Sequence, residues 1–279
     1  MRNFTFKGLF LTAVFMLLGC LSIQAADGDL ITRQITIKLD KAGTLLDKIG
    51  SSKMYKITNL KIVGKINGTD WKMIRVMAGR DYWGDVTKGN LSVLDLSEAK
   101  IVNGGDEYFV RGDYTSNDQI GDYAFYNCSG LTSLTLPDGI TSIDIRAFYG
   151  CSGLTSLTLP AGITSINYAA FAECSGLTSI YVYAEKVPKM GSDVFFYVDK
   201  KNCTVYVPKG TYADYRSSNF GYFENIVEFD ATGIDKTTTS TDVKEVSRYS
   251  VNGQRLAVPV KGLNIVKYSD GSARKVVVK

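Results

Sequence analysis

A 23-residue repeat is the feature that most constrains how this chain can fold. Related segments begin at Ile120, Ile143 and Ile166 and read IGDYAFYNCSGLTSLTLPDGITS, IDIRAFYGCSGLTSLTLPAGITS and INYAAFAECSGLTSIYVY. The residues that recur at this spacing are Phe125, Phe148 and Phe171; Cys128, Cys151 and Cys174; and Leu131, Leu154 and Leu177. One segment could bury roughly eight side chains. The free energy gained by this burial does not offset the conformational entropy lost when the segment becomes ordered, so neighbouring segments must stack.

Each repeat contains one short strand. In LTSLTL, Leu134 and Leu136 alternate with Thr135, which predicts leucines facing inward and hydroxyls facing outward. An L-x-x-L-x-L pattern within such a period is typical of a leucine-rich-repeat solenoid. Further apolar pairs fit the same strand: Ile37 and Leu39, Leu60 and Ile62, Leu94 and Leu96, Ile180 and Val182, and Val205 and Val207, with Ile226 after them. Seven or eight coils are therefore expected, with Ile37 aligned to Leu60 because 23 residues separate them.

The connections between strands have their own signals. Gly121, Asp144 or Asn167 follows the isoleucine of each coil, and because these residue types tolerate positive φ, we expect a tight corner there. A short helical or 3₁₀ turn would then carry Ala124 and Phe125 inward. AGTLLDKIG and GTDWKMIRVMAG are expected to be short helices that cap the N-terminal edge of the sheet.

The predicted fold is an α/β solenoid with a parallel β-sheet on its concave face, irregular N-terminal coils and a small β-hairpin module at the C-terminus. We divide the chain into residues 1–25, an export signal; 26–119, an N-terminal capping and irregular repeat region; 120–230, regular repeats and C-terminal coils; 231–247, a linker; and 248–279, a short β tail.

The first 25 residues have the pattern of an export signal, with a basic start at Arg2 and Lys7 followed by an apolar run. Cleavage after Ala25 is one reading. The other is a lipobox, because LLGC ends at Cys20, where a bacterial lipoprotein would be cut and acylated. Either reading predicts an exported protein at the cell surface or outside the cell. Membrane association would come only through a lipid at Cys20, since no later run approaches about 20 apolar residues.

The tail carries two turn signals, Asn252-Gly253 and Asp270-Gly271, which predict a three-stranded β unit. It resembles the end of the C-terminal sorting domains of secreted Bacteroidetes proteins, and the matching positions are Gly253, Gly262 and residues 275–279. A small hairpin module without a sorting role is the alternative.

The motif CSGLTSLTLPxGITSI, with an Ala-Phe pair before it, resembles the BspA-like bacterial surface leucine-rich repeats. NLKIVGKINGTDW followed by LSVLDLSEAKI resembles the N-terminal part of such proteins in gut Bacteroidetes. The resemblance spans roughly residues 30–230. It implies a surface or secreted protein that attaches to host matrix or to other cells.

Composition excludes several chemistries. The chain has no histidine, so nucleophiles activated by histidine and zinc sites built on imidazole are ruled out. Removing Arg2 and Lys7 leaves 30 basic against 28 acidic side chains, which gives no electrostatic case for nucleic acid. An open sheet offers no dry cleft for carboxylate catalysis. We predict no catalytic residue, metal or cofactor, and we expect the four mature cysteines (128, 151, 174 and 203) to be buried thiols, with a disulfide between neighbouring coils as the alternative.

Two sets of residues are candidates for binding. The outward strand residues form a row on the concave face that consists of Lys61, Asp95, Thr135, Thr158, Tyr181 and Tyr206, with Tyr183 near its end. Tyrosine and small polar groups make adaptable contacts to protein or glycan, although they also suit a solvated sheet face. The second set is Arg111, Gly112 and Asp113, the integrin-type RGD tripeptide in a polar loop, where the alternative is a chance match. The predicted function is macromolecular binding in adhesion; a glycan-binding accessory protein and a structural spacer are the alternatives.

Overall fold

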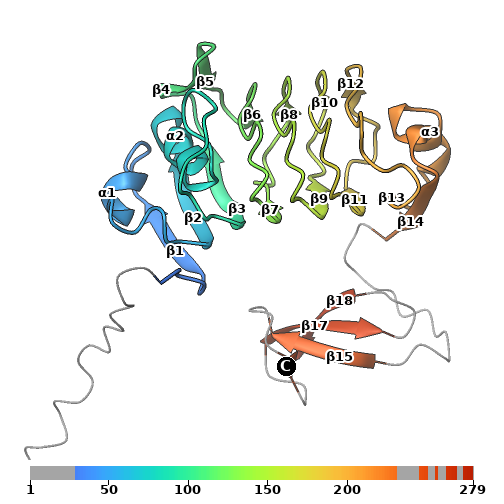
Figure 1. The fold of residues 1–279 in the computed structure, drawn as a ribbon. Coiled ribbons are helices and arrows are strands. Elements are labelled where there is room, and N and C mark those ends of the chain that lie inside the picture. The colour runs from blue at the N-terminus through green and yellow to red at the C-terminus, as the bar shows by residue number, and fades with distance from the viewer. Residues whose placement is uncertain (1–28, 231–244, 251–254, 257–261, 269–272, 279) are drawn as a thin grey trace, which may run out of the picture.

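The structure is a computed structural model that describes residues 29–230, 245–250, 255–256, 262–268 and 273–278. The export signal with Cys20, residues 231–244 and both turn signals of the tail lie outside the described residues. From residue 29 to residue 230 the chain winds as a stack of coils, with β1 near one end of the stack and α3 at the other (Figure 1).

Eight parallel strands form one side of the stack, here called the main sheet. They are β1 (Ile35–Leu39), β2 (Asn59–Ile66), β3 (Val93–Ile101), β7 (Ser133–Thr135), β9 (Ser156–Leu159), β11 (Ser179–Val182), β13 (Thr204–Pro208) and β14 (Asn225–Phe229). They pair in the orders β1-β2-β3-β7 and β14-β13-β11-β9. The two halves meet where the N–H of Thr155 donates to the carbonyl of Thr132 at 3.5 Å. The strands predicted from the alternation of apolar residues are therefore confirmed.

The register agrees with the sequence except at the first strand. Leu60 lies opposite Leu94, and Val205 opposite Ile226, as the spacing predicts. The alignment of Ile37 with Leu60 is wrong, because Ile35 occupies that place and Ile37 pairs with Ile62. The coil between β1 and β2 contains a helix, so the period of the regular repeats does not apply to it.

A second, narrower parallel sheet was not expected. It consists of β6 (Gln119–Ile120), β8 (Ser142–Ile143), β10 (Ser165–Ile166) and β12 (Lys189–Met190). Each strand has only two residues, and the isoleucines Ile120, Ile143 and Ile166 are fully buried. Figure 1 shows these strands on the side of the stack opposite β7, β9 and β11.

The positive φ expected at Gly121, Asp144 and Asn167 is wrong. Positive φ angles occur instead at two later positions of each coil. The first position is occupied by Tyr123, Arg146, Ala169 and Asp193, and the second by Asn127, Gly150, Glu173 and Tyr197. Gly121 is required for space, because a Cβ there would lie 2.5 Å from the Tyr108 hydroxyl oxygen. The amide of Asn167 donates to Asp144 at 2.8 Å, so these side chains connect coils rather than relieve backbone strain. The expected helical turn after the isoleucine is a run of turns outside any helix, although Ala124 and Phe125 are buried as predicted.

The core contains a continuous column of phenylalanine rings. Phe125 and Phe148 have ring centroids 5.2 Å apart, Phe148 and Phe171 5.0 Å, and Phe171 and Phe195 5.9 Å, with interplanar angles of 15°, 6° and 13°. All four rings are buried. The stacking that the repeat predicts is therefore confirmed, and Phe195 extends it by one coil.

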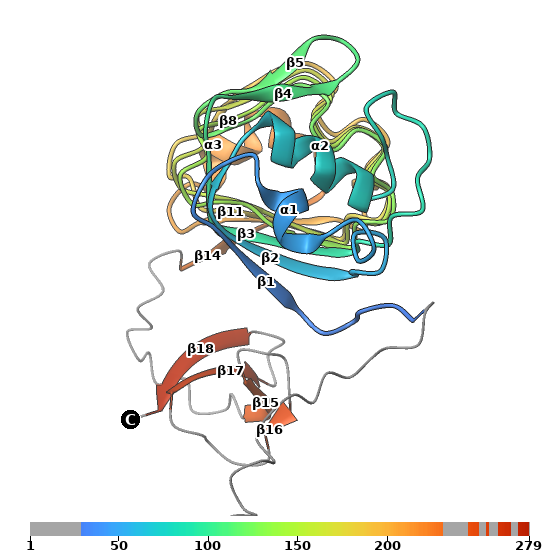
Figure 2. The same cartoon turned by 90° about the vertical axis from the view of Figure 1, so that its left-hand side faces the viewer.

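Helices and a hairpin cover the N-terminal end of the stack, as Figure 2 shows end-on. The helices are α1 (Leu45–Ile49) and α2 (Gly68–Met77), and the hairpin pairs β4 (Gly104–Phe109) with β5 (Asp113–Thr115). A capping box between Asn67 and Asp70 starts α2. Both helices agree with the sequence prediction, whereas the hairpin has no periodic pattern and was expected only as a polar loop.

At the other end, α3 (Tyr212–Arg216) and the 3₁₀ helix η1 (Asn219–Tyr222) follow β13. Phe220 and Phe223 pack against Phe195, with centroid distances of 5.4 and 5.0 Å, and so close the core. No helix in the described ranges is both long and apolar enough to cross a membrane.

The described part of the tail is an antiparallel sheet in the order β16-β15-β17-β18. Its strands are β15 (Glu245–Ser250), β16 (Arg255–Leu256), β17 (Gly262–Tyr268) and β18 (Ala273–Val278). The β character of the tail agrees with the prediction. It has a fourth strand, and β15 begins at Glu245, where we expected the linker to continue to residue 247.

Candidate functional site

The outward row of the main sheet is brought together by the strand register. Asp95 lies opposite Lys61 on one side and Thr135 on the other. In the second half of the sheet, Thr158, Tyr181 and Tyr206 occupy equivalent places, and the row continues to Val227. The structure therefore places the predicted outward row of the concave face on one surface.

The N-terminal part of this row is an ion-pair cluster. The ammonium of Lys61 lies 3.2 Å from Asp95 and 2.8 Å from Glu98. The hydrogen bond with Glu98 is the main reason why the pKa of Lys61 is raised. Burial alone would raise the pKa of Asp95, but hydrogen bonds from Ser97 and Lys61 outweigh it and lower that pKa. One ammonium is shared by two carboxylates, so the cluster keeps a net charge of about −1 and its cation is already paired.

The C-terminal part of the row is aromatic. The rings of Tyr181 and Tyr206 stack with centroids 4.5 Å apart and planes 7° from parallel. Phe229 meets Tyr181 and Tyr183 edge-on, at 6.1 and 5.1 Å. We call these four residues the aromatic patch. It is partly open to solvent, with Tyr183 38% and the adjacent Val227 46% exposed. Burial raises the pKa of Tyr181, so its hydroxyl stays protonated and can donate a hydrogen bond.

Phe229 and Val227 were missed in the sequence. The signal was present, because Ile226 was recognised as an inward residue of the last strand. Residues that alternate with it, Val227 and Phe229, must then face outward. Extending the outward row by one strand would have found both.

The Arg111-Gly112-Asp113 tripeptide lies at the turn of the β4–β5 hairpin, where Phe109 pairs with Asp113. Gly112 has a φ of +85°, which suits glycine in this turn. The guanidinium of Arg111 lies over the Tyr123 ring, 5.0 Å from its centroid. The carboxyl of Asp113 is half-buried and its Oδ2 has no hydrogen-bond partner among the described residues; burial, with a contribution from Asp122, raises its pKa to about 6. Integrin recognition by this tripeptide stays a prediction.

The cysteines of the coils are free, buried thiols. Cys151 Sγ donates to the carbonyl of Phe125 at 3.0 Å, and Cys174 Sγ to that of Phe148 at 3.1 Å. Burial raises the pKa of Cys128 to about 11 and that of Cys174 to about 12, so the thiolate, which is the metal ligand and nucleophile, is suppressed. Within the described ranges no three Cys, Asp or Glu side chains are grouped so that they could hold a metal ion.

The repeat family agrees with this geometry. Residues 114–226 match the family model described as the BspA type leucine rich repeat region, in six copies. Among solved structures, the chain is similar to a leucine-rich repeat protein from Bacteroides ovatus, with 20% sequence identity and a TM-score of 0.35. That match covers 71% of this chain and 42% of the other, so this chain spans less than half of that protein's length. None of the curated proteins compared with the chain matches it.

Proposed function

Residues 114–226 of this chain are a BspA type leucine-rich repeat region, and from this premise we propose that the chain binds a partner protein through the aromatic patch, without catalysis. Repeat regions of this kind are typical of proteins that bind other proteins or lie at a surface, and are less typical of enzymes. The sequence pattern of residues 1–25 supports a partner outside the cell, and the family resemblance favours host matrix or the surface of a neighbouring cell.

The stacked pair of Tyr181 and Tyr206 is the observation that carries this proposal. Tyrosines are enriched where proteins bind one another, because a rigid ring with a hydroxyl buries a large area at small entropic cost. Along the rest of the row, the outward groups are hydroxyls or mutually paired charges. The aromatic patch is therefore the part of the main sheet that offers the most energy to a partner.

The test is binding to a panel of purified extracellular-matrix proteins, measured by surface plasmon resonance. Tyr181→Ala and Tyr206→Ala should each weaken binding by about 1 kcal/mol or more, roughly fivefold in Kd. Thr135→Ala, in the same row but outside the aromatic patch, is the matched control and should bind like the native chain. Unchanged affinity in both tyrosine variants would exclude this surface.

A glycan array distinguishes the glycan-binding alternative. In the stacked pair each ring covers one face of the other, so fewer open ring faces remain for sugars to stack on, and we expect the array to stay blank. The structural-spacer alternative predicts no saturable binding to any matrix protein.

A further inference from the structure

The coils are joined by a second set of hydrogen bonds, here called the turn ladder, in the segments that follow β6, β8 and β10. In each coil three alternate backbone N–H groups donate to three carbonyls of the next coil, at 2.6 to 3.0 Å. In the first coil the donors are Tyr123, Phe125 and Asn127, and the acceptors are, in the same order, Ile145, Ala147 and Tyr149. The next set of donors is Arg146, Phe148 and Gly150, with the acceptors Tyr168, Ala170 and Ala172. The last set is Ala169, Phe171 and Glu173, with the acceptors Ser192, Val194 and Phe196. All these N–H groups point toward the C-terminal end of the stack.

At the N-terminal end, side chains replace the missing coil. The hydroxyl of Tyr108 donates to the carbonyl of Asp122 at 2.7 Å. The indole of Trp71 and the guanidinium of Arg75 both donate to the carbonyl of Ala124, each at 3.1 Å. Residues of α2 and β4 therefore occupy two of the three ladder carbonyls of this coil, those of Asp122 and Ala124.

At the C-terminal end, the turn ladder is open. Asp193, Phe195 and Tyr197 occupy the donor places of the last coil, and the φ angles of +56° at Asp193 and +61° at Tyr197 match those of Ala169 and Glu173 one coil earlier, +51° and +59°. Their backbone N–H groups have no acceptor among the described residues. A row of unpaired backbone donors resembles the open edge of a β-sheet, where another chain can add by hydrogen bonding.

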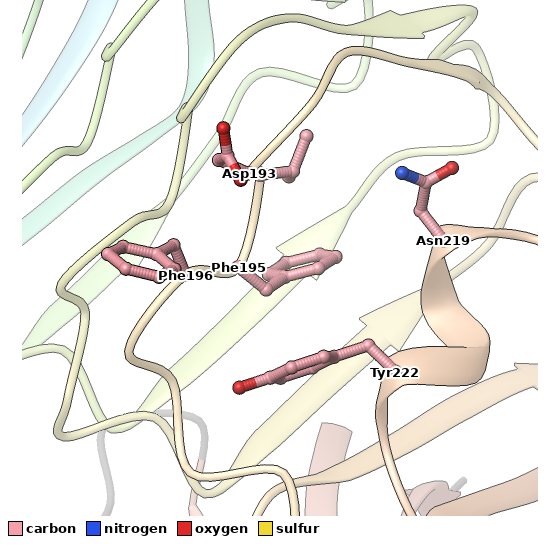
Figure 3. A pocket seen from close by; sticks show the side chains of 6 residues that line it. Asp193, Phe195, Phe196, Asn219 and Tyr222 are labelled. Atoms are coloured by element: carbon pink, nitrogen blue, oxygen red, sulfur yellow. The ribbon is translucent and has the colours of Figure 1, made fainter.

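The cap at this end adds donors, not acceptors. The amide of Asn219 donates to the carbonyl of Gly191 at 3.3 Å, and the hydroxyl of Tyr222 donates to the carbonyl of Val198 at 3.0 Å. Beside the open donors is a cavity of about 190 Å³, lined by Asp193, Val194, Phe195, Phe196, Asn219 and Tyr222 (Figure 3).

The chemistry of this edge fits a polypeptide backbone. The cavity is smaller than the roughly 300–1,000 Å³ of small-molecule sites. The carboxylate of Asp193 in its lining disfavours a charged anion, whereas a peptide carbonyl is a neutral acceptor. Phe196 and Tyr197, which are 51% and 68% exposed, offer apolar surface beside the donors. The N-terminal end of a second copy cannot supply all three carbonyls, because its own cap already occupies those of Asp122 and Ala124.

We propose that a segment of a partner protein, folded in the same run of turns as the preceding coil, binds at this edge and continues the turn ladder, with alternate backbone carbonyls accepting from the N–H groups of Asp193, Phe195 and Tyr197. Backbone hydrogen bonds of this kind provide affinity in strand-addition complexes. The segment carries a small side chain at its centre, because Phe220 and Phe223 already fill the next place in the ring column. This edge is separate from the aromatic patch, so either proposal can fail without the other.

The test is amide hydrogen exchange of the full chain, read by NMR. The amides of residues 193, 195 and 197 should exchange at least about tenfold faster than those of 169, 171 and 173, which hold the same places one coil earlier. The probe is a synthetic peptide of residues 189–199, because this segment already supplies carbonyls to the preceding coil. In the peptide, Asp193→Gly and Tyr197→Gly make the positive φ angles of these two positions accessible. Phe195→Ala removes a ring for which Phe220 and Phe223 leave no room. Saturating peptide should slow exchange at 193, 195 and 197 about tenfold.

A variant that fills the cavity tests the location. Asn219→Trp changes an exposed residue of the lining and should abolish the slowing by the peptide, while amides 169, 171 and 173 stay protected and report an intact fold. Asn103→Trp, an exposed position near the other end, is the matched control and should leave the slowing unchanged. Three results would overturn the proposal. They are full protection of the three amides in the free chain, protection by inorganic phosphate instead of the peptide, and protection that appears when the chain concentration alone is raised.

Discussion

The rings of Phe148 and Phe171 lie 5.0 Å apart and 6° from parallel, each contributed by the same position of neighbouring coils. Stacked rings of this kind hold one coil to the next, because a single coil buries too little to be stable alone.

Replacing Phe148 should therefore destabilise the whole stack. Phe148→Ala removes a fully buried ring from the middle of the column and should lower the free energy of unfolding by about 3–5 kcal/mol, measured by urea denaturation. Tyr168→Ala, an exposed aromatic residue of the next coil, is the control and should cost much less. Equal losses in the two variants would show that the column does not hold the coils together.

Arg75 should hold the first regular coil in place. Its guanidinium is buried, donates to the carbonyls of Tyr123 and Ala124 at 2.7 and 3.1 Å, and lies over the ring of Phe109. Arg75→Met keeps the bulk but leaves the carbonyl of Tyr123 without this donor, at a cost of about 1–3 kcal/mol.

Hydrogen exchange would locate the loss caused by Arg75→Met. Amides of the first regular coil should lose protection before those of residues 169–173. The exposed Lys65→Met variant should behave like the native chain. A uniform loss of protection along the stack would contradict a local role for Arg75.

The raised pKa of Asp113 predicts a pH-dependent stability. Its carboxyl has a pKa of about 6, above its ordinary 3.8, so the folded chain binds this proton more tightly than the unfolded chain. Stability from this group is therefore highest at low pH, falls between about pH 4 and pH 6, and stays lower above that range. Asp113→Asn should stabilise the chain at pH 7 by about 1 kcal/mol, after allowance for solvent screening of a half-exposed group, and should have little effect near pH 3.5. Thermal unfolding at the two pH values measures this; an equal gain at both would contradict the assignment.

The buried thiols should resist alkylation. Burial raises the pKa of Cys128 to about 11 and those of Cys174 and Cys203 to about 12, and only the thiolate reacts. Iodoacetamide at pH 8 should leave these residues unmodified in the folded chain and modify all of them in urea, as read by mass spectrometry. A disulfide-linked pair in the folded chain would instead remain unmodified in urea until a reductant is added.

The main sheet was predictable because its leucines and isoleucines alternate with hydroxyl residues, and this period of two is specific to strands. The second sheet was not, because strands of two residues, such as Ser142–Ile143, have no period to detect. The prediction assigned the positive φ angles to the residue types that tolerate them best, glycine, aspartate and asparagine. The structure has them at Tyr123 and Arg146 because the ladder between coils, rather than local preference, sets the backbone there.

The candidate site was predictable in part for the same reason. The outward row followed from the alternation, but the aromatic patch depends on how the rings of β11, β13 and β14 meet, and Phe229 joins it from a strand recognised by one isoleucine. The burial of Asp113 depends on the β4–β5 hairpin, whose pairing across Gly112 has no periodic pattern in the sequence.

The closing of the N-terminal end by Trp71, Arg75 and Tyr108 makes the length of this molecule adjustable. These side chains donate to the carbonyls of Asp122 and Ala124 in the first regular coil, and each later coil presents the equivalent carbonyls to its predecessor. Duplicating residues 143–165 within the gene would thus insert one more rung and leave both termini of the stack chemically unchanged. Unequal recombination could lengthen or shorten such a protein while preserving its ends.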